Sequence, residues 1–160
     1  MPRNAASPRS APPATAVEEV DTRFLETLLG YNARRAALAV IDVFIQRMAP
    51  YQLKPVDFSV LSLVHHNPGI TSRQLCTALG ILPPNLVGMI NQLEKRELVE
   101  RHPHPRDGRA MGLNLTAGGR KLMRDAERTA ADLEAAFASR LTAAELRTLI
   151  SLLQKIYRPQ

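Results

Sequence analysis

The stretch from Thr71 to Thr116 constrains the fold most, because it joins two short helix patterns to a basic turn between two strand patterns. Thr71 and Gln74 have the Thr-x-x-Gln spacing of a capping box, in which each side chain bonds the other residue's backbone. Gly80 follows the apolar face of this segment and suits a left-handed helix end. The sequence therefore predicts a short helix between Thr71 and Gly80.

A second helix is predicted to begin at Pro83 and Pro84, since proline is tolerated in a first helical turn. Leu86, Ile90 and Leu93 form one buried stripe at spacings of four and three. The opposite face is mostly uncharged and polar, and carries Asn85, Gly88, Met89, Asn91, Gln92 and Lys95. Such side chains can read base edges, and a glycine permits close approach.

A basic hairpin is predicted after this helix. Residues 98–101 and 112–115 alternate as strands do, and Pro103, Pro105 and Gly108 punctuate the connection. From Lys95 to Arg124 there are eight Lys and Arg against three Asp and Glu, so this segment holds +5 of the chain's net +6. A charge run is ordinarily a solvated surface, but this one suits phosphate capture with a wing tip in a minor groove.

The fold class predicted from these patterns is mainly α with a small β wing. It is a winged helix-turn-helix DNA-binding core, with N- and C-terminal helices forming a dimerisation domain. The candidate DNA-binding residues lie on the two short helices and the hairpin: Arg73, Pro84, Asn85, Gly88, Asn91, Gln92, Lys95, Arg101, His104, Arg106, Asp107 and Arg109.

The hairpin resembles the wing signature of the MarR family of bacterial transcription regulators. The resemblance lies in Asp-Gly-Arg at 107–109, Leu-Asn-Leu-Thr at 113–116 and the segment 93–101. It extends over roughly residues 22–157, with strong motifs from about 71 to 118. It implies a dimeric winged-helix repressor or activator whose DNA affinity is often tuned by a small, frequently phenolic ligand. It also implies that Arg109 enters the minor groove and that Asp107 holds it in place.

Two residues depart from the family pattern. Glu97 stands where the family usually has glycine, and a non-glycine residue held left-handed there costs on the order of 1 kcal/mol. That helix end is therefore a candidate for remodelling. Leu82 stands where a Ser or Thr cap is common, and the double proline is expected to compensate.

The terminal segments are predicted to pair with a second chain. A long helix from about Val20 to Met48 is apolar on more than one side, which calls for more than one partner. A linking helix from Ala117 to Ser139 precedes a last apolar helix, which begins at a second capping box, Thr142 to Glu145. The alternative is pairing within one chain. A homodimer would place two recognition helices about 34 Å apart, in successive major grooves.

Four segments follow from these patterns. Residues 1–18 are predicted to be a disordered tail, 19–53 a dimerisation helix, 54–116 the winged helix-turn-helix, and 117–160 the linking and C-terminal dimerisation helices. A core helix is expected to begin at Pro55 and to stop at residues 65–69.

Composition narrows the class of protein. The pI of about 10.1 suits a nucleic acid, although an anionic membrane surface would also attract such a chain. No run of eighteen apolar residues and no signal-peptide pattern occurs, and a single cysteine suits a reducing compartment, so a cytoplasmic protein without membrane contact is expected. No phosphate loop, nucleophile elbow or paired carboxylate motif occurs, so neither an enzyme nor a cofactor is expected.

No metal site is predicted either. His65 and His66 are adjacent helical residues that point about 100° apart, so they are not expected to share an ion. His102 and His104 could chelate, but no further ligand lies convincingly near them in the sequence. Cys76 suits a small core position better than a redox switch.

A ligand pocket is expected only by the resemblance, where the first, second and fifth helices meet near the dimer interface. Its candidate lining, with an arginine facing a carboxylate, is Tyr31, Arg34, Arg35, Met48, Phe58 and His65. Core packing is the alternative for the aromatic residues and the methionine, and solvated charge for the arginines. Two functions remain: a DNA-binding regulator, expected to act as a repressor, or a winged-helix module that uses the hairpin against a protein or membrane.

Overall fold

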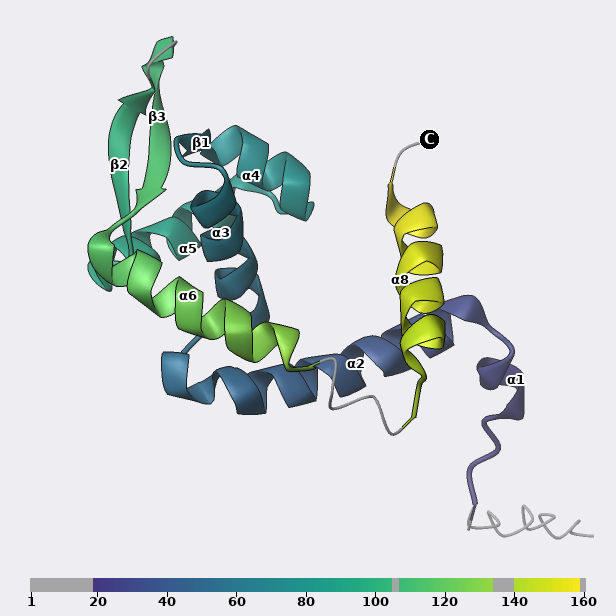
Figure 1. Ribbon diagram of the computed structural model, residues 1–160. Helices are drawn as coiled ribbons and strands as arrows, with labels where there is room; N and C mark the ends of the chain where they lie inside the picture. The colour runs from purple at the N-terminus through teal and green to yellow at the C-terminus, as the bar shows by residue number, and fades with distance from the viewer. Residues whose placement is uncertain (1–18, 105–106, 134–139, 159–160) are drawn as a thin grey trace, which may run out of the picture. The chain divides into compact units, whose positions relative to one another are not determined.

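The computed structural model describes residues 19–104, 107–133 and 140–158, so the predicted tail at 1–18 lies outside it. The chain divides into two compact units, Met1–Ala36 and Ala37–Gln160, which are described separately. The ribbon shows mainly helices and one small sheet (Figure 1), as the sequence predicts. No described helix is long and apolar enough to cross a membrane.

The prediction of one continuous helix from Val20 to Met48 is wrong. The chain forms a short α1, Arg23–Glu26, and then a long α2, Leu29–Met48. At the break, two side chains donate hydrogen bonds to backbone carbonyls. The Thr27 hydroxyl donates to Phe24 O at 2.7 Å, and Asn32 Nδ2 donates to Glu26 O at 2.7 Å. Such side-chain bonds compete with the helical ladder.

The helix starts predicted in the second unit are confirmed. After η1, Ala49–Tyr51, the helices are α3, Pro55–His66; α4, Ser72–Leu79; α5, Pro83–Lys95; α6, Ala117–Ala131; and α8, Ala143–Tyr157. Both predicted capping boxes are present, and Gly80 ends α4 with a φ of 62°. The linking helix was expected to reach Ser139, but α6 ends at Ala131, and residues 134–139 lie outside the described chain.

The sheet contains the predicted hairpin and one strand that the sequence did not indicate. Its antiparallel order is β1-β3-β2, formed by Ile70–Thr71, Asp107–Leu115 and Val99–His104. Gly112 allows the chain before β1 to approach β3, because a Cβ there would lie 2.7 Å from Gly69 O. The hairpin is thereby attached to the end of α3.

The core lies where α3, α4, α5, α6 and the sheet meet. Its fully buried side chains include Leu61, Leu75, Leu86, Ile90, Leu113 and Met123. Burial of each such side chain contributes about 1.5–3 kcal/mol relative to exposure. Gly119 lets α6 begin against Leu98, the residue before β2, because a Cβ at Gly119 would clash with the Leu98 carbonyl. This core holds α5 and the hairpin in one compact unit.

Candidate nucleic-acid interface

The second helix of the helix-turn-helix, α5, has one buried and one exposed face. Leu86, Ile90 and Leu93 are almost completely buried. Most of the predicted reading face is exposed, namely Asn85, Gly88, Asn91, Gln92 and Lys95, together with Pro84. Met89, which was predicted on the same face, is instead half-buried and packs against the core. A Cβ at Gly88 would meet no atom within 4 Å, so the backbone there is open to close approach.

Val87 belongs to the same face and was missed by the sequence analysis. Its side chain is 50% exposed, and it lies one helical turn before Asn91. An apolar side chain in this position suits contact with a thymine methyl group. The four-residue spacing between Val87 and Asn91 could have placed both on one face of the helix. Val87 was missed because an apolar residue in a helix is ordinarily assigned to the core.

Arg101 on β2 connects the hairpin to this face. Its Nη2 donates to Asn91 Oδ1 at 2.8 Å and lies 2.9 Å from Glu94 Oε2. The bond to Arg101 occupies the Asn91 carbonyl oxygen and leaves the Nδ2 group as a donor. Arg101 was predicted as a DNA contact, whereas Glu94, which anchors it, was not singled out from sequence.

The end of α5 keeps a regular form despite Glu97. The backbone of Glu97 is left-handed, with a φ of 55°, as expected for the position where the family has glycine. Leu98 N donates to Leu93 O at 3.0 Å and Glu97 N donates to Glu94 O at 2.8 Å, the paired bonds of a Schellman motif. The remodelling considered from sequence is therefore not seen, and the Leu82–Pro83 start of α5 also forms without a side-chain cap.

The wing forms as a β2–β3 hairpin, with Val99 opposite Leu115 and Arg101 opposite Leu113. Arg73, at the start of α4, is exposed and borders a shallow depression shared with Ala110 and Met111 of β3. This contact brings the first helix of the motif next to the wing. The side chains of His104, Arg106, Asp107 and Arg109 lie outside the described residues, so their DNA contacts remain predictions.

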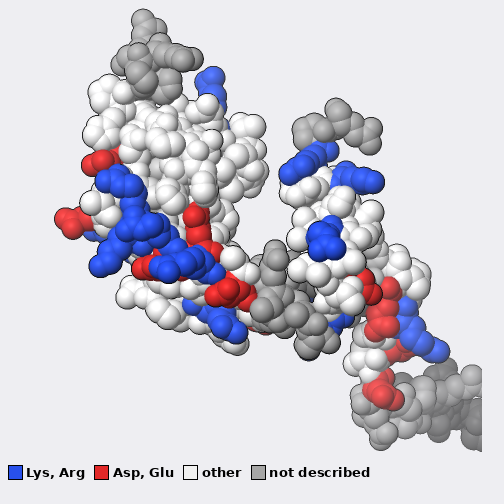
Figure 2. All heavy atoms as spheres, in the orientation of Figure 1, with Lys and Arg blue, Asp and Glu red and all other residues white. Residues whose placement is uncertain are grey.

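Basic side chains also gather over α6 (Figure 2). This helix carries four exposed basic residues, Arg120, Lys121, Arg124 and Arg128. Arg120 Nη1 donates to Leu115 O at 2.6 Å, which ties the start of α6 to the end of the wing. The positive charge therefore extends beyond the hairpin that the sequence analysis emphasised.

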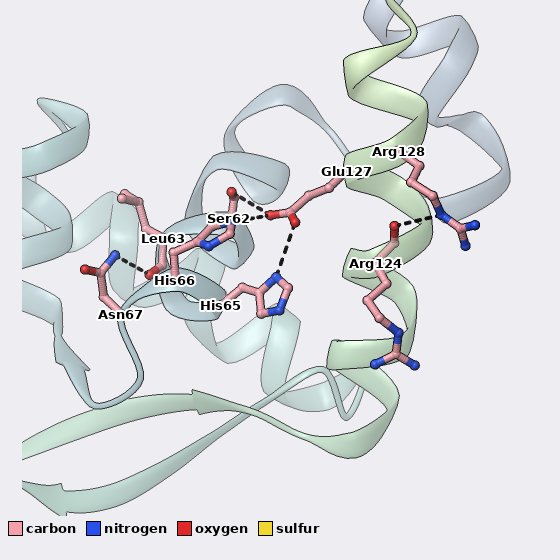
Figure 3. Close-up of polar contacts among 8 residues, drawn as sticks. All are labelled: Ser62, Leu63, His65, His66, Asn67, Arg124, Glu127 and Arg128. Carbon is pink, nitrogen blue, oxygen red and sulfur yellow. Dashed lines mark hydrogen bonds and ion pairs between the residues drawn. The ribbon is translucent and has the colours of Figure 1, made fainter.

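His65 and His66 were not expected to share an ion, yet both side chains approach the carboxylate of Glu127. His65 Nδ1 lies 3.4 Å from one Glu127 oxygen, and His66 Nε2 lies 2.9 Å from the other (Figure 3). Each ring uses a different nitrogen, and this compensates for the 100° between the two positions on the helix. Cys76 is a free, half-buried thiol packed against the core, the alternative preferred from sequence.

The predicted ligand residues lie in different surroundings. Met48 is fully buried in the core, and Phe58 packs edge-on against Phe44 with ring centroids 5.4 Å apart. The His65 side chain lies beside Glu127. In the first unit, Tyr31 is half-buried, whereas Arg34 and Arg35 are exposed on α2. The effector pocket remains a prediction.

The fold and this surface define a winged helix-turn-helix regulator of transcription, in which an exposed polar helix lies beside a β wing. A family model described as MarR family matches residues 51–110. A putative transcriptional regulatory protein for the hcr operon of Thauera aromatica is 30% identical over 131 residues, covering 81% of this chain and 79% of the relative. The chain belongs to the MarR family and is a DNA-binding regulator, not an enzyme.

Solved structures agree with this assignment. The transcriptional repressor CouR bound to a 23-mer DNA duplex superposes with a TM-score of 0.83 and 39% identity, covering 88% of this chain and all of that one. CouR bound to p-coumaroyl-CoA gives a TM-score of 0.80 and 37% identity, covering 89% of this chain and all of that one. The similarity therefore extends well beyond the winged helix itself.

Proposed function

We propose that this protein is a homodimeric cytoplasmic repressor that binds a palindromic operator and is released by an aromatic effector. The observation that carries the proposal is the division of α5, whose apolar stripe is buried while Asn91, Gln92 and Gly88 are exposed beside the hairpin. An exposed helix face that is nearly uncharged, next to concentrated positive charge, is suited to a major groove flanked by phosphates. The DNA complex of CouR supports this assignment.

Different residues are proposed to supply affinity and sequence preference. Arg73, Lys95 and the wing residue Arg109 are suited to phosphate or minor-groove contact, which depends little on sequence. Asn91 and Gln92 are suited to base edges, where a good bidentate contact contributes about 1–3 kcal/mol of discrimination. Arg101 contributes by holding the Asn91 amide in one orientation.

The test is duplex binding measured by fluorescence anisotropy at several salt concentrations. Arg109→Ala is expected to weaken binding to all sequences and to reduce the salt slope by about one. Asn91→Ala and Gln92→Ala are each expected to reduce the difference in binding free energy between operator and unrelated DNA by about 1–3 kcal/mol. Arg147→Ala on α8 removes the same charge from another helix, and should leave binding unchanged.

Unchanged affinity in Arg109→Ala would reject the wing assignment. Loss of all sequence preference in the Arg147 variant would reject the assignment of α5. If the unaltered protein binds no duplex at any salt concentration, the hairpin is instead a surface for protein contact.

The homodimer is proposed because large apolar side chains remain exposed on the terminal helices. Those of α1 and α2 include Phe24, Leu29, Val40 and Ile45, and those of α8 include Leu149, Leu152, Leu153 and Ile156. Monomeric proteins rarely leave contiguous apolar patches of this kind in water. A second copy of the chain is the proposed partner, because a two-fold dimer also presents two recognition helices.

The proposed effector is an aromatic acyl compound, by analogy with CouR bound to p-coumaroyl-CoA. The test adds p-coumaroyl-CoA, free p-coumarate or coenzyme A alone to the preformed DNA complex and follows its anisotropy. Release by the thioester or by the free acid supports an aromatic effector and distinguishes its chemical form. Release by coenzyme A alone, or by none of the three, contradicts this part of the proposal.

A further inference from the structure

A compact group of polar side chains joins α3 to α6 (Figure 3). Ser62 Oγ donates to Glu127 Oε1 at 3.0 Å, and His66 Nε2 lies 2.9 Å from the same oxygen. His65 Nδ1 approaches the other oxygen, Oε2, at 3.4 Å. The two imidazole rings lie beside one another with centroids 4.9 Å apart. One carboxylate therefore faces two imidazole nitrogens.

These atoms have the chemistry and spacing of metal ligands. Two imidazoles and a carboxylate, with ligand atoms all within 4.8 Å of one another, are the donors that Zn²⁺ and its neighbours accept. In a tetrahedral site with bonds of about 2.0–2.1 Å, ligand atoms lie roughly 3.3 Å apart. The nitrogen–oxygen distances of 2.9 Å and 3.4 Å bracket this value. These two contacts go to different oxygens of the carboxylate, and some ligand atoms lie up to 4.8 Å apart, so binding an ion would draw the widest pair together by up to about 1.5 Å.

The protein leaves one of these nitrogens without a hydrogen bond. His65 Nδ1 is buried, and although it lies 3.4 Å from Glu127 Oε2, the geometry is not that of a hydrogen bond. A buried polar atom without a partner costs about 1–3 kcal/mol, so such atoms are uncommon in folded proteins. A bound cation would satisfy this nitrogen directly, because a metal ion accepts the lone pair of a neutral imidazole.

The surroundings also favour a cation. Both histidines lie in the last turn of α3, where the carbonyl end of the helix dipole attracts positive charge. Glu127 borders a shallow surface depression that it shares with Arg124, Arg128 and Ala131, which gives access from solvent. Arg128 is paired with Asp125 rather than with Glu127, and its guanidinium is directed away from the group. Burial opposes ionisation of Glu127, but hydrogen bonds from Ser62 and His66 and the nearby imidazoles lower its pKa overall.

We propose that His65 Nδ1, His66 Nε2 and the Glu127 carboxylate bind one divalent transition-metal ion of the Zn²⁺ class. Three protein ligands leave a fourth position for water. Ser62 is a positioning residue, because its hydroxyl orients the carboxylate toward the histidines. The ion joins the end of α3, which leads into β1, to the middle of α6. This site is independent of the DNA-binding proposal, since none of its three ligands lies on α5 or the wing.

The test uses the full chain without a histidine tag, after treatment with a chelator. Co²⁺ is added as a spectroscopic probe and Zn²⁺ by calorimetric titration. The expected result is one ion per chain, with the visible absorption of tetrahedral Co²⁺. His66→Gln and Glu127→Gln are each expected to weaken binding at least tenfold. His102→Gln, at an exposed histidine on β2, is the matched control and should bind the ion as the unaltered chain does.

Thermal unfolding of each variant without metal separates loss of a ligand from loss of the fold. His66 is suited to this purpose because its side chain is 64% exposed, so its replacement leaves the core intact. Affinity unchanged by both His66→Gln and Glu127→Gln would overturn the proposal. So would binding abolished by His102→Gln, which would place the ion on the wing. Absence of Co²⁺ absorption together with a lowered melting temperature in Glu127→Gln would show an ion pair only.

Discussion

At the scale of single residues, the end of α5 holds a non-glycine residue in a left-handed backbone conformation. Glu97 is left-handed, which an L-residue disfavours, yet both of its backbone polar groups are used. Its N–H bonds Glu94 O, and its carbonyl accepts the Thr116 hydroxyl at 2.6 Å. These contacts hold the backbone that a glycine would adopt at lower cost. The reading helix and the wing are therefore joined through a strained residue.

Glu97→Gly is expected to stabilise the protein. Relief of the left-handed strain, on the order of 1–2 kcal/mol, exceeds the entropy that glycine adds to the unfolded chain, so a net gain of about 0.5–1 kcal/mol should remain. Urea unfolding measures this difference. Glu97→Ala is the control, because it removes the charge and keeps the strain. A gain in the alanine variant equal to that in the glycine variant would show that charge, not backbone conformation, limits stability.

At the scale of elements, what the sequence predicts depends on how local the signal is. The starts of α4, α5 and α8 were predictable because Thr71, Pro83 and Thr142 act within one turn. The break between α1 and α2 was not predictable, because the side chain of Asn32, which donates to Glu26 O there, lies six residues further along the chain. The polar face of α5 could be identified from its spacing, whereas the bond from Arg101 that orients Asn91 requires the hairpin to fold back.

The link between α3 and α6 was the least predictable part, since His66 and Glu127 are separated by 61 positions. Sequence spacing describes one helix at a time and carries no information on which helices meet. The same limit explains why β1 was missed, because a strand of two residues is defined by its pairing with β3.

The contact between Glu127 on α6 and the side chains of α3 predicts that the stability of the fold depends on pH. The folded state lowers the pKa of Glu127, so its stabilisation is fully present above the ordinary value of 4.5 and is lost as the pH falls through the lowered value. In the presence of a chelator, the stability difference between the unaltered chain and Glu127→Gln should therefore shrink below about pH 4.5. Urea unfolding between pH 3 and 7 tests this, and a difference that grows toward acid would contradict the lowered pKa.

At the scale of the whole molecule, the exposed apolar side chains of the terminal helices set the assembly that we propose. Ile156 on α8 is 61% exposed. Burial of such a side chain contributes about 1.5–3 kcal/mol, and a symmetric dimer would bury one copy from each protomer. Ile156→Glu is therefore expected to weaken dimerisation by about a hundredfold or more. Ser151→Glu adds the same charge at a polar position of α8, and should leave the sedimentation profile unchanged.

Sedimentation velocity across a range of protein concentrations provides this comparison. A dimer unaffected by Ile156→Glu would place the interface elsewhere. A monomer in the unaltered chain would remove the two-fold arrangement and leave each winged helix to bind alone.

The most direct test of the central claim is selection of bound sequences from a random pool of duplex DNA. If α5 reads the major groove as part of a dimer, the enriched sequences should form a palindrome with half-sites about 10 base pairs apart or a multiple of that spacing. Asn91→Ala should weaken the base preference at specific positions within each half-site. Enrichment of no sequence, or of a pattern that Asn91→Ala and Gln92→Ala leave unchanged, would contradict the account.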